Sequence, residues 1–165
     1  MTYSLNDKYL RTIPEKFDFD NPQVDPKELF ENMKKTMISF SGYGLTCNQV
    51  GINLQMFVFG DSKNSEEILG LFNPKIVHYS DDTSENLESC LSIPKFVCQI
   101  KRSNSIRIRA TNFEGFTDTV TFSGMSARIV QHEYSHLQGK LITDYISKLK
   151  YDMIKKKIEK GTFKT

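Results

Sequence analysis

The chain has 165 residues, enough for one domain with a hydrophobic core of its own. Its 22 basic and 20 acidic residues leave a formal charge of only +2, which argues against DNA or RNA as the main partner. No apolar run is long enough to span a bilayer, the first twenty residues lack the pattern of a secretion signal, and the three cysteines cannot all pair. We therefore expect a cytoplasmic protein with reduced thiols and no membrane partner.

The first half of the chain predicts one helix between extended segments. Residues 1–24 contain two prolines and little periodicity, so we expect them to be extended on the surface. A helix is predicted to begin after Asp25, with Pro26 at its first position and Glu28 three residues after the cap. Apolar residues four apart continue it, and the glycines of SGYG end it. Strands are predicted at 55–60 and 74–79, with polar loops at 60–67 and 80–86.

The following segment alternates like an antiparallel sheet. In residues 105–110, Ile106 and Ile108 alternate with arginines, which predicts a strand with one buried face. The connections are short enough for hairpins. Further strands are predicted at 96–101 and 116–122, with a turn at 111–115.

From Ser123 the period becomes that of a helix, which Gly139 is placed to end. Met125, Ile129, His132 and His136 are spaced four, three and four residues apart, so they share one face, which we expect to point inward. Residues 140–146 are predicted to be a short strand or extended segment. Residues 147–161 predict a Lys-rich amphipathic helix that ends at Gly161.

Residues 132–136 form an H-E-x-x-H motif. Residues four apart on a helix lie one turn above each other, so His132 and His136 can converge on one metal ion. Glu133 would then lie beside a bound water and could move a proton. Two histidines on a helix can also be ordinary polar-face residues. The metal site is favoured because both continue the apolar stripe, and a buried histidine pair without partners would be costly.

A hydrolytic metal site needs a third protein ligand. No histidine follows His136, and the nearest downstream carboxylate is that of Asp144. Upstream, Cys90 stands in a segment predicted to be a polar loop turning into a strand, and a thiolate is a strong ligand for zinc or ferrous iron. A lone cysteine is more often a small core residue. The residues alone therefore leave the role of Cys90 open.

Three segments resemble, in order and spacing, the signature motifs of the peptide deformylase family. They are GYGLTCNQVG at 42–51, ESCLS at 88–92 and QHEYSHLQG at 131–139, beside the family patterns G-x-G-L-A-A-x-Q, E-G-C-L-S and Q-H-E-x-D-H. The resemblance covers about residues 8–160. It implies an α+β fold with antiparallel strands around a central H-E-x-x-H helix and a C-terminal helix. We expect a single catalytic domain over residues 1–165.

The resemblance implies a hydrolase that removes the formyl group from formyl-methionyl nascent peptides and releases formate. It assigns one divalent metal ion to Cys90, His132 and His136: Fe2+ natively, with Zn2+, Ni2+ or Co2+ in preparations. Glu133 would be the general base that later protonates the leaving amine. Gln49 and the backbone N–H of Leu91 would stabilise the developing oxyanion.

Further roles follow from the same resemblance. The peptide would bind by strand addition, and the residues expected to contact it are Tyr43, Gly44, Ser89, Met125 and Ile129. Glu88 and Arg102 are expected to pair and hold the Cys90 segment. Arg128 is predicted to be a solvated side chain rather than a substrate contact. The lysines of the C-terminal helix are either a ribosome contact, as in some family members, or a solvated face.

Four residues depart from the family patterns. Ser89 replaces a glycine, which would cause strain only at positive φ. Ser135 replaces an aspartate, so a carboxylate beside the metal ligands is missing. Thr46 and Cys47 replace two alanines. None of these positions carries a predicted ligand, the general base or an oxyanion donor.

Two other functions stay open. A metallopeptidase using the same helix would take a His or Glu as its third ligand and would not need Cys90. A deformylase-like protein that binds formylated peptides or ribosomes without hydrolysis would explain Ser89 and Ser135. The intact Glu133 and Gln49 argue against that second alternative.

Overall fold

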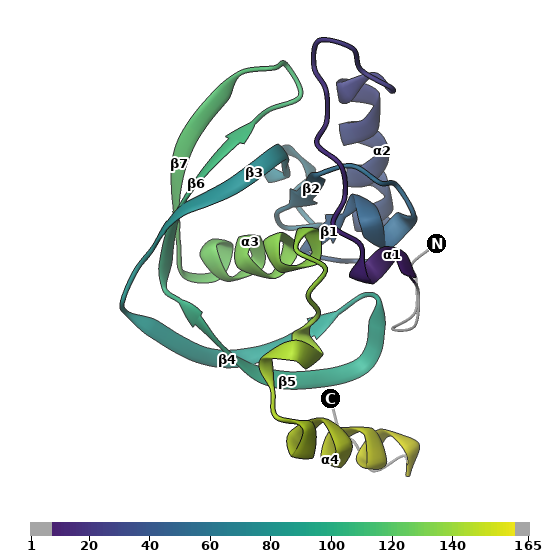
Figure 1. Cartoon of the computed structure of the whole chain (residues 1–165), viewed down its shortest axis with the longest axis vertical. Helices are drawn as coiled ribbons and strands as arrows, with labels where there is room; N and C mark the ends of the chain where they lie inside the picture. The colour runs from purple at the N-terminus through teal and green to yellow at the C-terminus, as the bar shows by residue number, and fades with distance from the viewer. Residues whose placement is uncertain (1–7, 161–165) are drawn as a thin grey trace.

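The computed structural model describes residues 8–160, in which two antiparallel sheets enclose a central helix (Figure 1). The larger sheet has the strand order β1-β2-β3-β6-β7, and the smaller one pairs β4 with β5. The strands are β1 (Gly44–Thr46), β2 (Met56–Phe59), β3 (Leu69–Tyr79), β4 (Thr83–Cys90), β5 (Ile93–Ser103), β6 (Ser105–Thr111) and β7 (Thr117–Ser123). The predicted α+β class is confirmed.

The three longer helices follow the sequence signals closely, and a short one was not predicted. They are α1 (Lys8–Arg11), α2 (Pro26–Ser39), α3 (Gly124–Leu137) and α4 (Lys148–Glu159). Asp25 caps α2 by accepting a hydrogen bond from the Glu28 backbone N–H at 2.7 Å, with Pro26 as the first helical residue, as predicted. None of the described helices is both long and apolar enough to cross a membrane.

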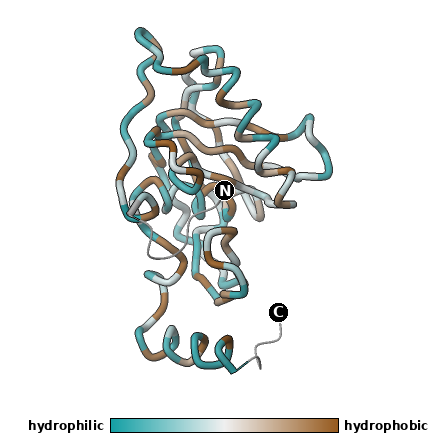
Figure 2. The backbone as a smooth tube through the Cα atoms, turned by 90° about the vertical axis from the view of Figure 1, so that its right-hand side faces the viewer, coloured by the Kyte–Doolittle hydropathy of each residue, from teal (hydrophilic) through white to brown (hydrophobic). Residues whose placement is uncertain are grey.

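The buried hydrophobic residues form three clusters, one of which holds α3. One joins Ala127 and Val130 of α3 to buried residues of the larger sheet such as Phe57 and Ile108. A second packs α2 on β1, β2 and β3, and a third packs α1, the segment after α3 and α4 on β5. Figure 2 shows hydrophobic and hydrophilic residues alternating around α4 at the lower end of the molecule. Because both sheets enclose α3, its last two turns are held against the ends of β1 and β4.

Three predictions about local structure are wrong. Residues 80–86 were expected to form a loop, but β4 begins at Thr83 and pairs along β5. Its sequence is polar because most of its side chains are exposed, and only Glu88 and Cys90 are buried. Within 140–146 the structure forms a 3-10 turn, Ile142–Tyr145, rather than a strand. Residues 1–24 include α1, and the expectations for residues 1–7 and Gly161 lie outside the described part.

Candidate metal centre and active site

Three side chains able to bind a metal ion meet where α3 passes the end of β4. Cys90 Sγ lies 3.3 Å from His136 Nε2, and the ligand atoms of Cys90, His132 and His136 all lie within 4.8 Å of one another. A thiolate and two imidazoles form a donor set typical of zinc or ferrous iron. The structure therefore brings the three predicted ligands together. Cys90 is the buried last residue of β4, not part of a loop.

The surroundings of Cys90 favour its thiolate. Burial raises the pKa of this thiol, but the charges and hydrogen bonds of His136 and His132 outweigh burial and bring the pKa well below its usual value. The two other thiols differ, because burial raises the pKa of Cys98 to about 11 and that of Cys47 further. The structure describes all three cysteines, and among them only Cys90 has a lowered thiol pKa, which favours the thiolate that binds metals.

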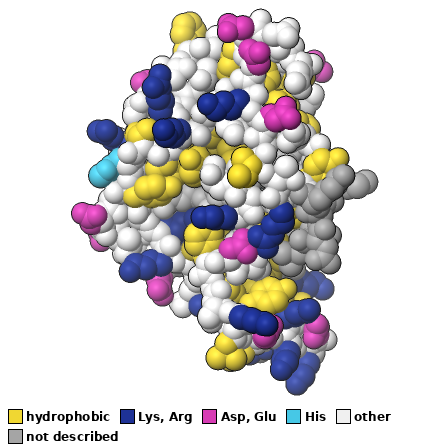
Figure 3. All heavy atoms as spheres, in the orientation of Figure 1, with side chains coloured by type: hydrophobic (Ala, Val, Ile, Leu, Met, Phe, Trp, Pro, Cys, Tyr) yellow, Lys and Arg dark blue, Asp and Glu magenta, His cyan; other side chains and the backbone are white. Residues whose placement is uncertain are grey.

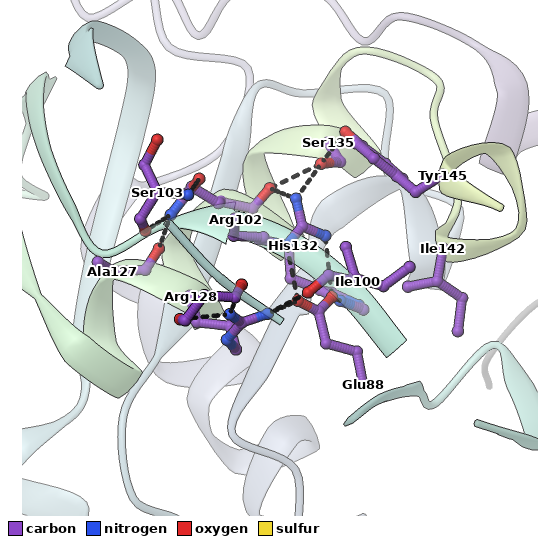
Figure 4. A network of polar contacts seen from close by, with 12 residues as sticks. Glu88, Ile100, Arg102, Ser103, Ala127, Arg128, His132, Ser135, Ile142 and Tyr145 are labelled. Atoms are coloured by element: carbon purple, nitrogen blue, oxygen red, sulfur yellow. Dashed lines mark hydrogen bonds and ion pairs between the residues drawn. The ribbon is translucent and has the colours of Figure 1, made fainter. Parts of the chain in front are cut away.

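Glu88 connects the ligand His132 to two arginines (Figure 4). Its Oε1 accepts hydrogen bonds from Arg102 Nε at 2.7 Å and from Arg128 Nη1 at 2.9 Å. Its Oε2 accepts from Arg102 Nη2 at 2.9 Å and pairs with His132 Nδ1 at 3.0 Å. Burial raises the pKa of Glu88, but the hydrogen bonds from His132 and Arg102 bring it down to about 2. The carboxylate holds the His132 ring by Nδ1, which leaves Nε2 on the side of Cys90.

Arg128 is the functional residue that the sequence reasoning placed wrongly. It is only 6% exposed, and besides Glu88 it donates to the backbone oxygens of Ile100 at 2.9 Å and Ser84 at 2.7 Å. The prediction of a solvated side chain is therefore wrong. Arg128 lies one turn before His132 on α3, so the same helical face carries both to Glu88. That spacing could have indicated the contact.

The serine that replaces the family aspartate is fully engaged. Ser135 Oγ accepts a hydrogen bond from Arg102 Nη1 at 3.2 Å and donates to the Gln131 backbone oxygen at 2.7 Å. Tyr145 brings its hydroxyl within 2.7 Å of the same Oγ and its ring over the Arg102 guanidinium. In this chain Ser135 and Tyr145 together contact Arg102, in place of the aspartate of the family pattern (Figure 4).

The Glu133 carboxylate is buried and tightly held. Thr46 Oγ1 donates a hydrogen bond to Glu133 Oε2 at 2.6 Å. Burial raises the pKa of Glu133, and the nearby histidines and this hydrogen bond offset only part of the rise. A buried carboxylate with a raised pKa beside the predicted metal ligands is suited to accept and return a proton.

Gln49 points its amide nitrogen at the metal centre. Its Oε1 accepts a hydrogen bond from the Thr46 backbone N–H at 2.8 Å, which fixes the orientation of the amide. Its Nε2 then lies 3.0 Å from Ser92 Oγ and 3.6 Å from Cys90 Sγ. A buried N–H donor is thus held beside the ligand sulfur, where negative charge could be stabilised.

An open cavity of about 680 Å3 lies over these groups. The predicted substrate positions all line it: Tyr43, Gly44, Ser89, Met125 and Ile129. Among the described strands, β1 and β4 each end their sheet, so both have a free edge, and residues at the ends of both reach this cavity. Met125 is 65% exposed, so the expectation that this side chain points into the core is wrong. Ser89 has no positive φ, and serine is therefore unstrained there.

Replacing Gly44 with alanine is expected to lower the kcat of the predicted hydrolysis by about 100-fold. A Cβ at position 44 would lie 2.3 Å from Glu133 Oε1, so the carboxylate of the predicted general base would have to move, and misplacing such a group by about 1 Å costs this much. Steady-state assays measure the effect. Gly42→Ala is the matched comparison, because its Cβ would meet only a methyl group of Leu91, at 2.9 Å, and this side chain can rotate away. Equal losses in both variants would contradict the expected contact with Glu133.

The chain is similar to known proteins in sequence and in fold. The profile of the polypeptide deformylase family matches residues 2–152. The peptide deformylase of Bartonella tribocorum is 36% identical over 163 residues, covering 95% of this chain and 89% of its own. A plant peptide deformylase 1B crystal structure superimposes with a TM-score of 0.87 at 32% identity, over 96% of this chain and 86% of its own. A Legionella pneumophila peptide deformylase gives 0.88 at 29% identity, over 98% and 94%.

Proposed function

The chain belongs to the polypeptide deformylase family, whose members remove the N-terminal formyl group from nascent peptides, and we propose that it does so at Cys90, His132 and His136. The single observation that carries the proposal is the convergence of these three ligand atoms within 4.8 Å below the open cavity. Formyl-methionyl peptides are the substrates of this family. Hydrolysis breaks the formamide C–N bond and yields formate and a free amine.

Cys90, His132 and His136 would hold one divalent metal ion. The donor chemistry fits, because the thiol is prepared as a thiolate and Glu88 already holds the His132 ring. By resemblance to the family we propose Fe2+ as the native ion, with Zn2+, Ni2+ or Co2+ as substitutes. When bound, the ion would lower the pKa of a water molecule and polarise the formyl carbonyl.

Glu133 and Gln49 would carry out the proton transfer and charge stabilisation. Glu133 accepts the proton of the attacking water and returns it to the leaving amine, a step suited to its raised pKa. The Gln49 amide and the backbone N–H of Leu91 would donate to the oxygen that becomes negative. Because the Thr46 backbone N–H already holds the Gln49 amide, this side chain would need to move little during the reaction.

The substrate peptide would add as a strand at the free edges of β1 and β4. Its backbone would bond near Tyr43, Gly44 and Ser89, and its methionine side chain would enter the part of the cavity bounded by Met125 and Ile129. Hydrogen bonds to the backbone give affinity for many sequences. The apolar wall then selects the first side chain.

A formate-release assay on anaerobically prepared iron protein tests this function. With a formyl-methionyl tripeptide we expect equimolar formate and free amine, and no product from the acetylated peptide. Removing the metal with a chelator should abolish turnover, and adding Fe2+ or Zn2+ should restore it. Tight binding of the formyl peptide with no formate would instead support a binding protein without hydrolysis.

We also propose that the chain acts in the cytoplasm and contacts the ribosome through α4. Figure 3 shows Lys and Arg side chains gathered over the lower end of the molecule, where α4 lies. Basic side chains on one helix can bind ribosomal RNA through its phosphates. Co-sedimentation with ribosomes, with and without the residues after Ser147, measures this contact.

A further inference from the structure

Two buried polar atoms of adjacent side chains lack a hydrogen-bond partner in the described part of the chain. They are Asn48 Oδ1 and His136 Nδ1, and no other buried side-chain nitrogen or oxygen of residues 8–160 shares this condition. Asn48 is 2% exposed and His136 1%. A buried polar atom without a partner loses its hydration without replacement, so such atoms are rare. They lie on the two residues that the Asn48 Nδ2 hydrogen bond to the His136 backbone oxygen joins, and they do not bond each other in this structure.

The orientation of the Asn48 amide is not arbitrary. Its Nδ2 donates a hydrogen bond to the backbone oxygen of His136 at 2.8 Å. Exchanging the amide nitrogen and oxygen would place two acceptors against each other, so this bond fixes the assignment. Asn48 Oδ1 is therefore an acceptor held on the same residue whose ring nitrogen needs a partner.

We propose that Asn48 is a positioning residue for His136, with its Oδ1 accepting the Nδ1 proton of the imidazole through one buried water. The proposal rests on the metal site of the proposed function. Metal-binding histidines usually donate their second ring N–H to a carboxylate, carbonyl or water, which fixes tautomer and ring orientation. Glu88 does this for His132, and the proposal gives Asn48 the same role for His136.

The consequence is a defined tautomer of His136. With the proton on Nδ1, the lone pair of Nε2 faces the site, where Cys90 Sγ lies 3.3 Å away. Asn48 belongs to the 3-10 turn Cys47–Val50, which also carries Gln49. One short turn thus supplies both a donor beside the ligand sulfur and the acceptor that orients a ligand ring.

The affinity of the full chain for Zn2+ and Co2+, measured by competition with a chelator, tests the proposal without an activity assay. Asn48→Leu removes the acceptor and the donor at similar size, and we expect about 10- to 100-fold weaker binding. Asn48→Asp keeps an acceptor but loses the donor to the His136 carbonyl, and we expect affinity within a few-fold of wild type. Gln55→Leu is the control: it also removes a side-chain amide bonded to a backbone oxygen, that of Pro14, away from the metal site.

The outcomes separate the alternatives. If Asn48 mattered only through its bond to the His136 carbonyl, the Asp and Leu variants would lose equal affinity, and the proposal would be overturned. Unchanged affinity in Asn48→Leu would overturn it as well, with the proposed metal centre intact. Wild-type protein that binds neither metal would overturn both.

A second measurement needs no variant. In 15N-histidine-labelled wild-type protein loaded with Zn2+, we expect His136 to carry a slowly exchanging proton on Nδ1 and to bind metal through Nε2. A His136 ring without a proton on Nδ1 would contradict the proposal even if Asn48→Leu failed to fold.

Discussion

Replacing Glu133 with glutamine is expected to lower kcat for formate release by about 100- to 10,000-fold while zinc content stays at the wild-type level. The amide has the same size and can still accept the Thr46 hydrogen bond, which measures 2.6 Å to the carboxylate. It cannot take a proton from water or return one to the amine. Single-turnover formate release and metal analysis of the same sample measure both quantities.

Asp144→Asn is the matched control for this carboxylate-to-amide change. Asp144 follows α3, pairs with Arg11 and caps the 3-10 turn by accepting from the Leu141 N–H, and it does not line the open cavity. We expect its kcat to be unchanged. Normal turnover in Glu133→Gln would show that another group moves the proton. Loss of turnover in Asp144→Asn would show that the effect of a carboxylate-to-amide change is not specific to Glu133.

The elements with strong periodicity could be predicted from the sequence. The apolar stripe and cap of α2 and the alternation of β6 are local signals, and both appear at the expected residues. β4 gave no such signal, because most of its side chains are exposed and only those of Glu88 and Cys90, near its end, are buried. The reason these two are buried lies on α3, about 40 residues away, so no local pattern could reveal it.

The candidate site was predictable where a motif named its residues and unpredictable where this chain departs from the motif. Thr46 replaces an alanine and was treated as neutral, but its hydroxyl bonds Glu133. Arg128 was expected in solvent, but it shares Glu88 with Arg102. Both contacts join residues at least 40 positions apart. The spacing of Arg128 and His132 could have indicated the second contact, but the first becomes visible only when the packing of α3 between the sheets is known.

The buried cluster around Glu88 also explains why these contacts belong together. One carboxylate compensates two guanidinium groups and orients one imidazole, and an unpaired buried charge is costly. The same ion cluster joins α3 to β4 and β5 and holds the ring of a proposed metal ligand, so removing one of its members would leave a buried charge without a partner. Stability and metal affinity should be coupled at these residues.

Cys90→Ala is expected to abolish formate release and to weaken Zn2+ binding by more than about 100-fold. That is the largest loss expected when a metal-binding side chain loses only its outer hydrogen-bond partner. The reason is that alanine removes one of three ligands and the negative charge that balances the ion. Metal content after dialysis against a weak chelator measures the loss. The folded fraction, followed by circular dichroism, should stay close to that of wild type.

Cys98→Ala makes the same change at a second buried cysteine and serves as the control. Cys98 is 2% exposed and pairs across the smaller sheet with Glu88, but burial keeps its thiol neutral. We expect its metal content and formate release to match wild type. A metallopeptidase with a His or Glu as its third ligand predicts the opposite for Cys90→Ala, namely full metal content. That ligand would have to move in or come from elsewhere, since within residues 8–160 the one group of such side chains with ligand atoms within 4.8 Å of one another is Cys90, His132 and His136.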